Sequence, residues 1–465
     1  MAATYWIAPS GSNSNPCSET QPCASIQYGV SKLYAGDTLN IKSGIYKETN
    51  TDSVTFFDIP VAINVPRSGT QASPIVIQAA PGDEGSVTID LQATYLGFHL
   101  GGHQNYIHIK NINIRNARST AINVPDAGDS TSYNETAKWS IGLLIEGNTI
   151  TDTYGSGPGR NTAAVRIYHV RDSIIRNNTI DRVGTTDLIN ELSHNGCILS
   201  YGLWNITVEN NLLSRCGAEA IAWKKQALDL PETGYQSIIR FNKFTDNYRT
   251  VWSGSGRGNT TAKMLISNNI FENYYLGIDC DGRGNVGCDL TVSHNFFNAT
   301  GPNSYHAEAI VVRDDLTSLK GAIFGNIYHR NEANVYDFRY KYQGFNQVDY
   351  NIFTSEPKNW LYGYDSEALS TSTLGQWQAL VNLPPLPNNP DSNSVISSIS
   401  SMAINLSSQD YKLPAVSVGI NFMPNGDNIG PYQTGDEVIG PRSSDNLVRL
   451  ASPNSPANLS ISIAN

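Results

Sequence analysis

The chain repeats one short pattern through its middle, an asparagine followed by any residue and then by a large apolar residue. Eight copies recur at roughly regular intervals, with steps of 30, 33, 31, 27, 26, 31 and 25 residues between successive asparagines. The eight asparagines are Asn148, Asn178, Asn211, Asn242, Asn269, Asn295, Asn326 and Asn351. Helical repeats keep a nearly constant length, whereas the coils of a β-solenoid accept loops of different lengths. The irregular steps therefore predict a solenoid of β-strands.

Strand-forming segments accompany the repeat. Stretches rich in β-branched residues, such as 205–208 and 289–292, precede most copies, and no segment keeps an apolar period of 3.6 residues. Apolar residues make up 40% of the chain, which is enough for an extensive core. We expect an all-β protein, a single parallel β-helix (β-solenoid), with a short amphipathic helix over 24–33 that caps the first coil.

Both ends of the chain carry motifs that resemble a known superfamily. The motifs are Ala8-Pro9-Ser10-Gly11, Gly36-Asp37-Thr38 and Gly44-Ile45-Tyr46, then Asp410-Tyr411-Lys412-Leu413 and Asn428-Ile429-Gly430-Pro431-Tyr432. Together with the eight repeats, they resemble the pectate-lyase-like superfamily of right-handed parallel β-helices. The resemblance implies a right-handed helix over residues 1–433, with an N-terminal cap at about 5–48, and a bias toward polysaccharide chemistry. We expect an irregular excursion at about 375–409 and a polar tail at 434–465.

Charge and hydropathy limit the partners of the chain. The formal net charge is −10 and no block of Lys or Arg occurs, so we expect no binding to nucleic acid. No apolar run approaches the roughly 18 to 20 residues that cross a bilayer. No signal-peptide core follows the first residues, so we expect any export signal to have been removed. The predicted partner is an acidic polysaccharide, bound by a monomer.

The cysteines indicate an oxidising, extracellular compartment, because disulfides persist there. The six are Cys17, Cys23, Cys197, Cys216, Cys280 and Cys288. Six cysteines allow many pairings, and only proximity favours joining the first two and the last two. The middle two fall in successive repeats. Buried free thiols are the alternative, and the spacing does not match a tetrahedral zinc site.

A second β-stretch follows most copies of the repeat and can be aligned on one apolar residue that is expected to point inward. These residues are Val165, Ile198, Ile221, Val251, Ile278, Ile310 and Val335. Because side chains alternate along a strand, the next residue and the third residue should point outward on one solvent-facing side. The outward pairs are Arg166/Tyr168, Leu199/Tyr201, Ala222/Lys224, Trp252/Gly254, Asp279/Asp281, Val311/Arg313 and Tyr336/Phe338. Stacked coils lie about 4.8 Å apart, close to the length of a sugar residue, which predicts a surface for an extended polysaccharide.

Loops of unusual length flank these strands. Extra residues occur at 151–162, 181–196, 226–237 and 298–308, and we expect them to form the walls of a cleft. The alternative is a solvated sheet whose aromatic and charged residues have no ligand. A combination of tyrosine, tryptophan, lysine, arginine and paired aspartates on neighbouring coils favours the cleft.

The segment 217–225, Gly-Ala-Glu-Ala-Ile-Ala-Trp-Lys-Lys, resembles the lysine-bearing coil of the alginate-lyase and chondroitinase-B type of polysaccharide lyase. In those enzymes a glutamate precedes the catalytic lysine by five positions, as Glu219 precedes Lys224 here. The resemblance implies a lyase with Lys224 as its catalytic residue. Gly217 stands where a second, calcium-binding glutamate is expected, and Gly254 stands where an arginine is expected. Calcium is therefore left as an open cofactor.

β-Elimination from a uronate removes a weakly acidic proton at C5, and cations stabilise the enolate that forms. Lys224 would act as the base if Lys225 or Arg313 depresses the pKa of its amine, since a like charge disfavours protonation. Tyr201 would then protonate the leaving oxygen. The alternative is that Lys224 is a solvated surface lysine without a catalytic role.

The remaining candidates are expected to contact the substrate. They are Arg166, Tyr168, His194, Glu219, Lys225, Trp252 and Tyr336. Arginine suits this purpose because its guanidinium binds a carboxylate through two hydrogen bonds, and Arg313 could act in the same way. His194 and His306 fit turn caps better than catalysis, and Lys225 could be structural.

A glycoside hydrolase is the main alternative to the lyase. Asp279 and Asp281 should project outward roughly 6.5 to 7 Å apart, at the short end of the range for inverting hydrolysis. Asp314 and Asp315 could contribute. The Asp279 and Asp281 pair could instead stabilise the turn at 282–284 or bind calcium. An epimerase and a noncatalytic carbohydrate-binding protein, such as an adhesin, are further alternatives.

Overall fold

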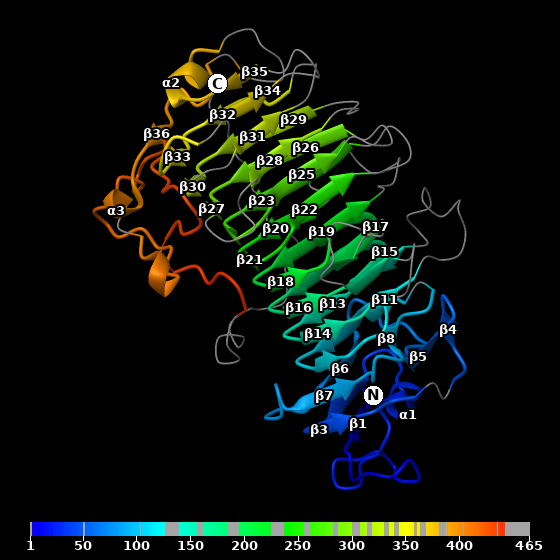
Figure 1. Cartoon of the computed structure of the whole chain (residues 1–465). Helices are drawn as coiled ribbons and strands as arrows, with labels where there is room; N and C mark the ends of the chain where they lie inside the picture. Colours follow the sequence, from blue (N-terminus) through cyan, green and yellow to red (C-terminus); the bar gives the residue numbers. More distant parts are fainter. Residues whose placement is uncertain are drawn as a thin grey trace.

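The strands of the computed structural model form successive coils of one parallel β-helix (Figure 1). The described residues are 2–49, 52–102, 104–125, 139–155, 161–184, 195–224, 237–254, 261–281, 287–299, 307–313, 319–329, 334–338, 344–357, 360–362, 369–380, 387, 389–402, 404–434 and 436–441. Each complete coil contributes one strand, or one half of a long strand, to each of three faces. The fold class expected from the sequence is confirmed.

The three faces consist of parallel pairings throughout. The first face contains β1 (Thr4–Ile7), β2 (Thr38–Ile41), β6 (Ile75–Ala79), β9 (Ile107–Lys110), β12 (Ser140–Ile141), β13 (Leu144–Glu146), the C-terminal halves of β15 (Thr162–Arg176) and β17 (Asn195–Glu209), β20 (Ser237–Arg240), β23 (Thr261–Ser267), β26 (Gly287–Ser293), β29 (Leu319–Phe324) and β32 (Gln347–Asp349). The second face contains β3 (Gly44–Tyr46), β7 (Val87–Asp90), β10 (Asn113–Arg115), β14 (Thr149–Thr153), β16 (Thr179–Val183), β18 (Leu212–Cys216), β21 (Lys243–Thr245), β24 (Ile270–Glu272), β27 (Phe296–Asn298), β30 (Ile327–His329), β33 (Ile352–Phe353) and β36 (Val395–Ile396).

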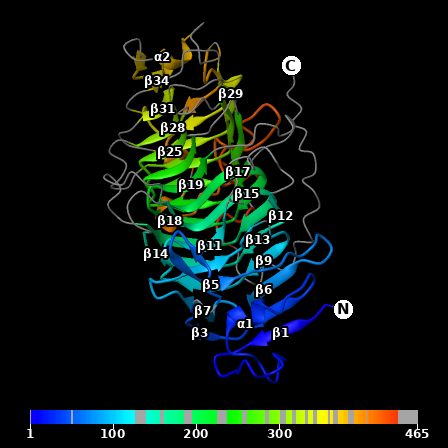
Figure 2. The ribbon, with the colours of Figure 1, turned by 90° about the vertical axis from the view of Figure 1, so that its right-hand side faces the viewer.

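The third face is called the site face below, because it carries the candidate residues. It contains β5 (Ile59–Asn64), β8 (Leu96–His99), β11 (Thr120–Val124), the N-terminal halves of β15 and β17, β19 (Glu219–Lys224), β22 (Arg249–Gly254), β25 (Leu276–Asp281), β28 (Glu308–Val312), β31 (Asn334–Phe338) and β34 (Trp360–Tyr362). Figure 2 shows β11, β15, β19, β25 and β31 stacked along the molecule. The short strands β4 (Thr55–Phe56) and β35 (Leu369–Thr371) pair antiparallel with β5 and β34.

The eight-fold sequence repeat corresponds to the bend between the first and second faces. The residue before each repeat asparagine has a positive φ, between 55° and 69°, which turns the chain sharply. These residues are Gly147, Asn177, Asn210, Phe241, Asn268, His294, Gly325 and Tyr350. The asparagine follows inside the coil, the strand of the second face begins at the next residue, and the apolar residue two positions after the asparagine is the second residue of that strand.

The repeat asparagines form a continuous ladder inside the helix. Each Nδ2 from Asn148 to Asn326 donates to the Oδ1 of the asparagine on the next coil, at 3.0 to 3.2 Å. Each Oδ1 from Asn178 to Asn351 also accepts the backbone N–H of the asparagine before it. The ladder thus satisfies buried backbone and side-chain polar groups together.

The apolar residues of the repeat stack beside this ladder. Four successive ring pairs join Phe244, Phe271, Phe297, Tyr328 and Phe353, with centroids 5.0, 4.5, 5.1 and 5.3 Å apart. All five side chains are buried. Because each coil adds one ring to the stack, the core grows with the number of coils rather than in width.

The ends of the helix are closed by irregular segments. Helix α1 (Ile26–Val30) is shorter than the predicted 24–33, and it begins where Glu48 accepts the backbone N–H of Ile26 at 2.7 Å. The expected excursion at 375–409 includes parts of α2 (Leu374–Gln378), β36, α3 (Ile399–Met402) and the 3-10 helix η5 (Leu406–Ser408). No described helix is long and apolar enough to span a membrane.

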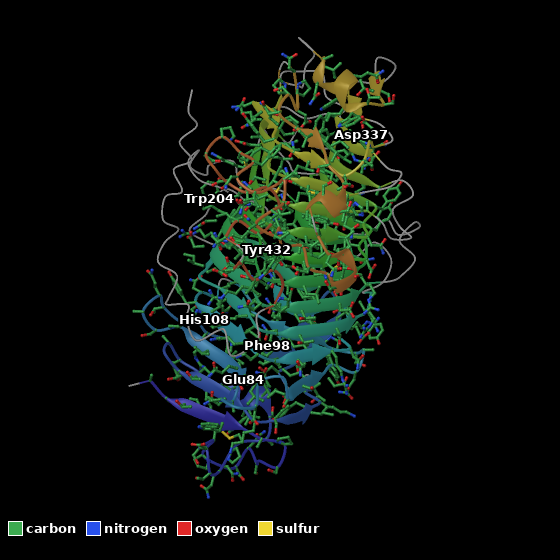
Figure 3. The ribbon with its side chains drawn as sticks, turned by 90° about the vertical axis from the view of Figure 1, so that its left-hand side faces the viewer. Glu84, Phe98, His108, Trp204, Asp337 and Tyr432 are labelled. Carbon is green, nitrogen blue, oxygen red and sulfur yellow. A yellow bond between two sulfur atoms is a disulfide. The ribbon has the colours of Figure 1, made fainter. Side chains whose placement is uncertain are left out.

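The segment after η5 crosses the outer side of the second face. Tyr411 and Ile429 pack against Phe296, Ile327 and Ile352 in a cluster separate from the main core. Figure 3 labels Tyr432 on this segment, in front of the strands of the second face. Further along, the backbone N–H of Gly440 donates to the carbonyl of Phe241 at 2.8 Å. Most of the expected tail, from residue 442 onward, lies outside the described residues.

All six cysteines form disulfides. Cys17 bonds to Cys23 and Cys280 to Cys288, as proximity suggested, and Cys197 bonds to Cys216 across successive strands. The alternative of free buried thiols is therefore wrong.

Candidate functional site

The strand register of the site face brings the predicted side chains into two columns. One column, called column A below, runs Asn64, His99, Asn123, Arg166, Leu199, Ala222, Trp252, Asp279, Val311 and Asp337. The other, column B, runs Tyr168, Tyr201, Lys224, Gly254 and Asp281. Arg313 directly follows β28 and extends column B by one coil beyond Asp281, and its backbone N–H donates to the carbonyl of Cys280 at 3.0 Å. The predicted alignment is therefore confirmed for these residues.

The columns lie on the outside of the helix. Leu199, Ala222 and Trp252 form a small apolar cluster with Tyr201 at its edge, and this cluster is separate from the main core. Ile198, Ile221 and the other aligned residues belong to the core instead. The inward and outward assignment follows from alternation along the strand, as predicted.

The outward side chains are much less exposed than expected. Lys224 is 4% exposed, Asp281 2%, and Arg166 and Trp252 are fully buried. Tyr201 and Arg313 are partly exposed. The side chains pack on one another, since the Lys224 ammonium lies 5.0 Å from the Tyr201 ring centroid and 5.9 Å from that of Trp252. The expectation of a column fully open to water is therefore wrong, and its charges sit in a surrounding of low polarity where electrostatic interactions are strong.

Lys224 and Tyr201 are hydrogen-bonded partners on neighbouring coils. Lys224 Nζ donates to the Tyr201 hydroxyl at 2.8 Å, and Asn161 Nδ2 donates to the same hydroxyl at 2.9 Å. The Tyr201 ring also contacts Tyr168 edge to face, with centroids 4.7 Å apart. The tyrosine is thus fixed by three neighbours, and its hydroxyl can exchange a proton with the lysine.

Asp279 lies at the centre of a buried ion network. Its Oδ1 accepts from Arg313 Nε at 2.9 Å, and its Oδ2 lies 3.2 Å from Arg249 Nε. Arg249 also reaches Glu219 Oε1 at 3.1 Å, so it links carboxylates of the preceding and following coils. Burial raises the pKa of Asp279, and the negative charge of nearby Asp281 raises it further. The guanidinium groups of Arg249 and Arg313 lower this pKa, but by less.

Arg313 does not lie beside Lys224. The two residues are three coils apart in column B, roughly 14 Å at about 4.8 Å per coil. Burial alone would lower the pKa of Arg313, but Asp279, Asp281 and Glu308 together raise it. Arg313 therefore interacts with the carboxylates at its own end of the site face and not with Lys224.

The predicted outward orientation is wrong for both members of the pair Tyr336/Phe338, which lie in the main core. Tyr336 pairs with Ile310, is fully buried, and packs against Tyr328, Phe338 and Trp377. The error arises because two successive residues point inward where the site-face strands bend. In most coils the first of the two is small, whereas in β31 it is Val335, which has the size that is typical of the second. The outward residue of this coil is Asp337, and the substrate contact expected of Tyr336 has no basis.

Several sequence candidates lie outside the described residues. They are His194, Lys225, His306, Asp314 and Asp315. The same holds for most of the expected cleft walls, at 156–160, 185–194, 226–236 and 300–306.

Gly217 and Glu219 stand where the alginate-lyase and chondroitinase-B type of lyase is expected to bind calcium, and they do not fit a calcium site. Calcium takes six to eight oxygen ligands, mainly carboxylates. Glu219 is paired with the Arg249 guanidinium, and no cluster of three or more metal-ligating side chains occurs in the described part of the chain. No step of the proposed chemistry is therefore assigned to calcium.

The sequence alignment did not include several polar residues of the site face, among them Arg249, His99 and Asn123. Arg249 precedes the bend in β22, at the same level as Glu219, and the alignment examined only residues after the bend. His99 and Asn123 stand on earlier coils, directly below Arg166 in column A. Both could have been found by extending the alignment to Phe98 and Ile122, which pair with each other in the same register.

Two family models match the chain. Residues 5–154 match "Pel9A-like, right handed beta helix region", and residues 96–297 match "Right handed beta helix region". Both descriptions agree with the observed coils and with the handedness implied by the sequence motifs. No curated protein matches the chain.

Solved structures with a similar fold include enzymes of different classes. A rhamnogalacturonan lyase is 12% identical with a TM-score of 0.47, covering 96% of this chain and 97% of that chain. Pectate lyase Pel9A is 13% identical with a TM-score of 0.39, covering 93% and 96%. A GH136 lacto-N-biosidase from Eubacterium ramulus is 12% identical with a TM-score of 0.37, covering 85% and 68%. Similarities this low carry no argument about the reaction. The two family matches and the three-faced coil identify the chain as a right-handed parallel β-helix protein with a Pel9A-like N-terminal region.

Proposed function

We propose that the protein is a polysaccharide lyase that cleaves a uronate-containing acidic polysaccharide by β-elimination. The observation that carries this proposal is the 2.8 Å hydrogen bond between Lys224 Nζ and the Tyr201 hydroxyl, on the outer side of the coils. A lysine and a tyrosine in contact supply the base and the acid that an elimination needs. We further propose that the protein acts outside the cell as a monomer, in keeping with its three disulfides.

The reaction can be written with these two side chains alone. Lys224, with its amine neutral, removes the C5 proton of the uronate. The C4–C5 double bond forms, the C4–O4 bond breaks, and Tyr201 donates its proton to the departing oxygen. The Lys224 ammonium then returns a proton to the Tyr201 oxygen along their hydrogen bond. Both groups recover their initial state, and no water is consumed.

The surroundings of the pair support this chemistry. The buried site strengthens the attraction between cationic side chains and the carboxylate that gains enolate character. The partly exposed Tyr168 and Tyr201 offer ring faces or edges along the same column.

Substitution of the two residues tests the proposal. We expect Lys224→Ala to lower the rate of ultraviolet-absorbing product formation from alginate or pectate roughly 100- to 10,000-fold, since that is the range for a lost general base or acid. Tyr201→Phe should lower kcat with little change in KM. Lys110→Ala is the matched control, because Lys110 lies on the first face and pairs with Glu146. Full lyase activity in Lys224→Ala would refute the assignment of the base.

A glycoside hydrolase is the second candidate, because Asp279 is a carboxyl group whose pKa is raised by burial. A raised pKa suits a general acid, and Asp281 on the same strand would act as the partner carboxylate. The two arginines bound to Asp279 weigh against this role, since they compete for its oxygens.

The products of the same incubations separate the candidates. A hydrolase would release reducing ends without ultraviolet absorbance, and Asp279→Asn and Asp281→Asn would each abolish that release. An epimerase would change the sugar composition of the polymer without cutting it. A noncatalytic binding protein would bind the polysaccharide and leave it unchanged.

A further inference from the structure

Arg166 in column A carries a buried charge without a carboxylate partner among its hydrogen bonds. The residue is fully buried, and its Nη2 donates to the backbone carbonyl of Asn161. Its Nε and Nη1 have no hydrogen-bond partner in the part of the chain that the structure describes. A buried guanidinium that has no counter-ion is unfavourable, because burial removes the water that solvates its charge.

The charges around Arg166 do not offset this cost. Burial lowers the pKa of Arg166, and the groups that act in the opposite direction are the hydroxyls of Tyr168 and Tyr201. His99, two coils below, has its pKa lowered to about 4 by burial, so its imidazole is neutral near pH 7. The geometry and the charge together suit an anion that comes from outside the chain.

Asn123 adds a hydrogen-bond acceptor beside the open donors of Arg166. It pairs with Arg166 in the strand register, and its Nδ2 lies 2.9 Å from His99 Nδ1. The buried Asn123 Oδ1 has no hydrogen-bond partner among the described residues. Two donors and one acceptor on neighbouring coils match a carboxylate next to a hydroxyl, as on a uronate ring.

An aromatic hairpin completes this end of the site face. The Arg166 guanidinium lies 5.4 Å from the Phe56 ring centroid and 5.7 Å from that of Phe57. Phe57 stands in the β4–β5 turn with φ 51°, a backbone conformation that is unfavourable for an aromatic residue, and is 48% exposed. The turn thus holds an exposed ring next to the buried cation, where a sugar could stack.

We propose that Arg166 and Asn123 form a subsite that binds one uronate residue, with its carboxylate on Arg166 and its ring against Phe57. This inference rests on the proposed function and specifies the substrate. Lys224 stands two coils further along, roughly 10 Å at about 4.8 Å per coil, or about two sugar residues. The enzyme would therefore require a charged uronate about two residues from the bond that it cleaves.

Calorimetric titration of tetragalacturonate and tetramannuronate, each with its methyl ester as a neutral counterpart, tests the subsite. We expect one acid to bind the wild-type protein more tightly than its ester, and Arg166→Met to weaken that binding roughly 10- to 100-fold. The methyl ester should bind both proteins equally. Arg171→Met is the matched control, because Arg171 lies on the same strand but pairs with Asp172 on the first face.

Thermal unfolding without ligand gives a second readout. Since Arg166→Met removes an unpaired buried charge, we expect the variant to have an equal or higher Tm than the wild type. A clearly lower Tm would show that Arg166 has a structural partner and would overturn the proposal. So would equal affinity of both acids and their esters for the wild type, or unchanged binding by Arg166→Met.

The binding experiment also separates this inference from the lyase proposal. A protein that cleaves the polymer but binds equally well after Arg166→Met would refute the subsite alone. A protein that binds the tetrauronate through Arg166 but cleaves nothing would refute the lyase and leave the subsite intact.

Discussion

At the scale of single residues, Asp391 is a carboxyl group that is buried inside the coils and held by hydrogen bonds. It ends the asparagine ladder, since its Oδ1 accepts from Asn351 Nδ2 at 2.8 Å and from Ser394 Oγ at 2.7 Å. Its Oδ2 accepts from Trp377 Nε1 at 2.8 Å. Burial nevertheless raises the pKa of Asp391 to about 6, and Asp349 also acts to raise it.

This pKa predicts a specific pH dependence of stability. Because the folded-state pKa lies above the ordinary value of 3.8, the folded protein binds more protons than the unfolded chain between about pH 4 and 6. The contribution of Asp391 is fully present below pH 4 and is lost as the pH rises through 6. We expect the free energy of unfolding of the wild type, relative to Asp391→Asn, to fall by about 3 kcal/mol over this range. Urea unfolding at a series of pH values measures it, and parallel curves would contradict the assignment.

Residue positions could be predicted where one structural rule governs them. Alternation along the strand was enough to bring Tyr201, Lys224 and Asp281 into one column. It failed for Tyr336, because the bend in each site-face strand turns two successive side chains inward. It also could not foresee that Arg249 and Arg313 bind Asp279, since ion pairing depends on side-chain reach across coils rather than on strand position.

At the scale of elements, the turn between the first and second faces explains the repeat. A residue with positive φ, a ladder asparagine and an apolar residue recur because the bend, the hydrogen-bond ladder and the core stack each need one of them. The sequence pattern revealed the periodicity, but not the ladder. The pattern alone does not distinguish an asparagine at an exposed turn from one whose amide is buried.

Removal of one ladder residue should lower the stability of the β-helix. Asn242 Nδ2 donates to Val208 O, Arg240 O and Asn269 Oδ1 at 2.9 to 3.0 Å, and the residue is fully buried. Asn242→Ala leaves these acceptors without their donor, so we expect a loss of about 3 kcal/mol in the free energy of unfolding.

The control for this variant is Asn113→Ala. Its side chain makes one exposed hydrogen bond, to the carbonyl of Gly85, so a loss below about 1 kcal/mol is expected. Chemical unfolding of both variants provides the comparison. Equal stability of the two would mean that the ladder contributes little.

At the scale of the whole molecule, the stacking of coils determines what the chain can bind. Each coil contributes one position to each column, so a charge, an aromatic ring or a hydrogen-bond donor recurs about every 4.8 Å along the site face. The fold, its handedness and two of its disulfides could be predicted from repeats, motifs and cysteine spacing, whereas the spacing left the Cys197–Cys216 pair open. The degree of burial of the columns could not, because it depends on how the side chains of neighbouring coils pack.

The most direct test of the elimination mechanism is digestion of alginate and pectate in water labelled with heavy oxygen, followed by mass spectrometry of the products. An elimination by Lys224 and Tyr201 consumes no water, so we predict unsaturated oligosaccharides without the label, and none from Lys224→Ala. Saturated products that carry heavy oxygen at the new end would contradict the account and identify a hydrolase.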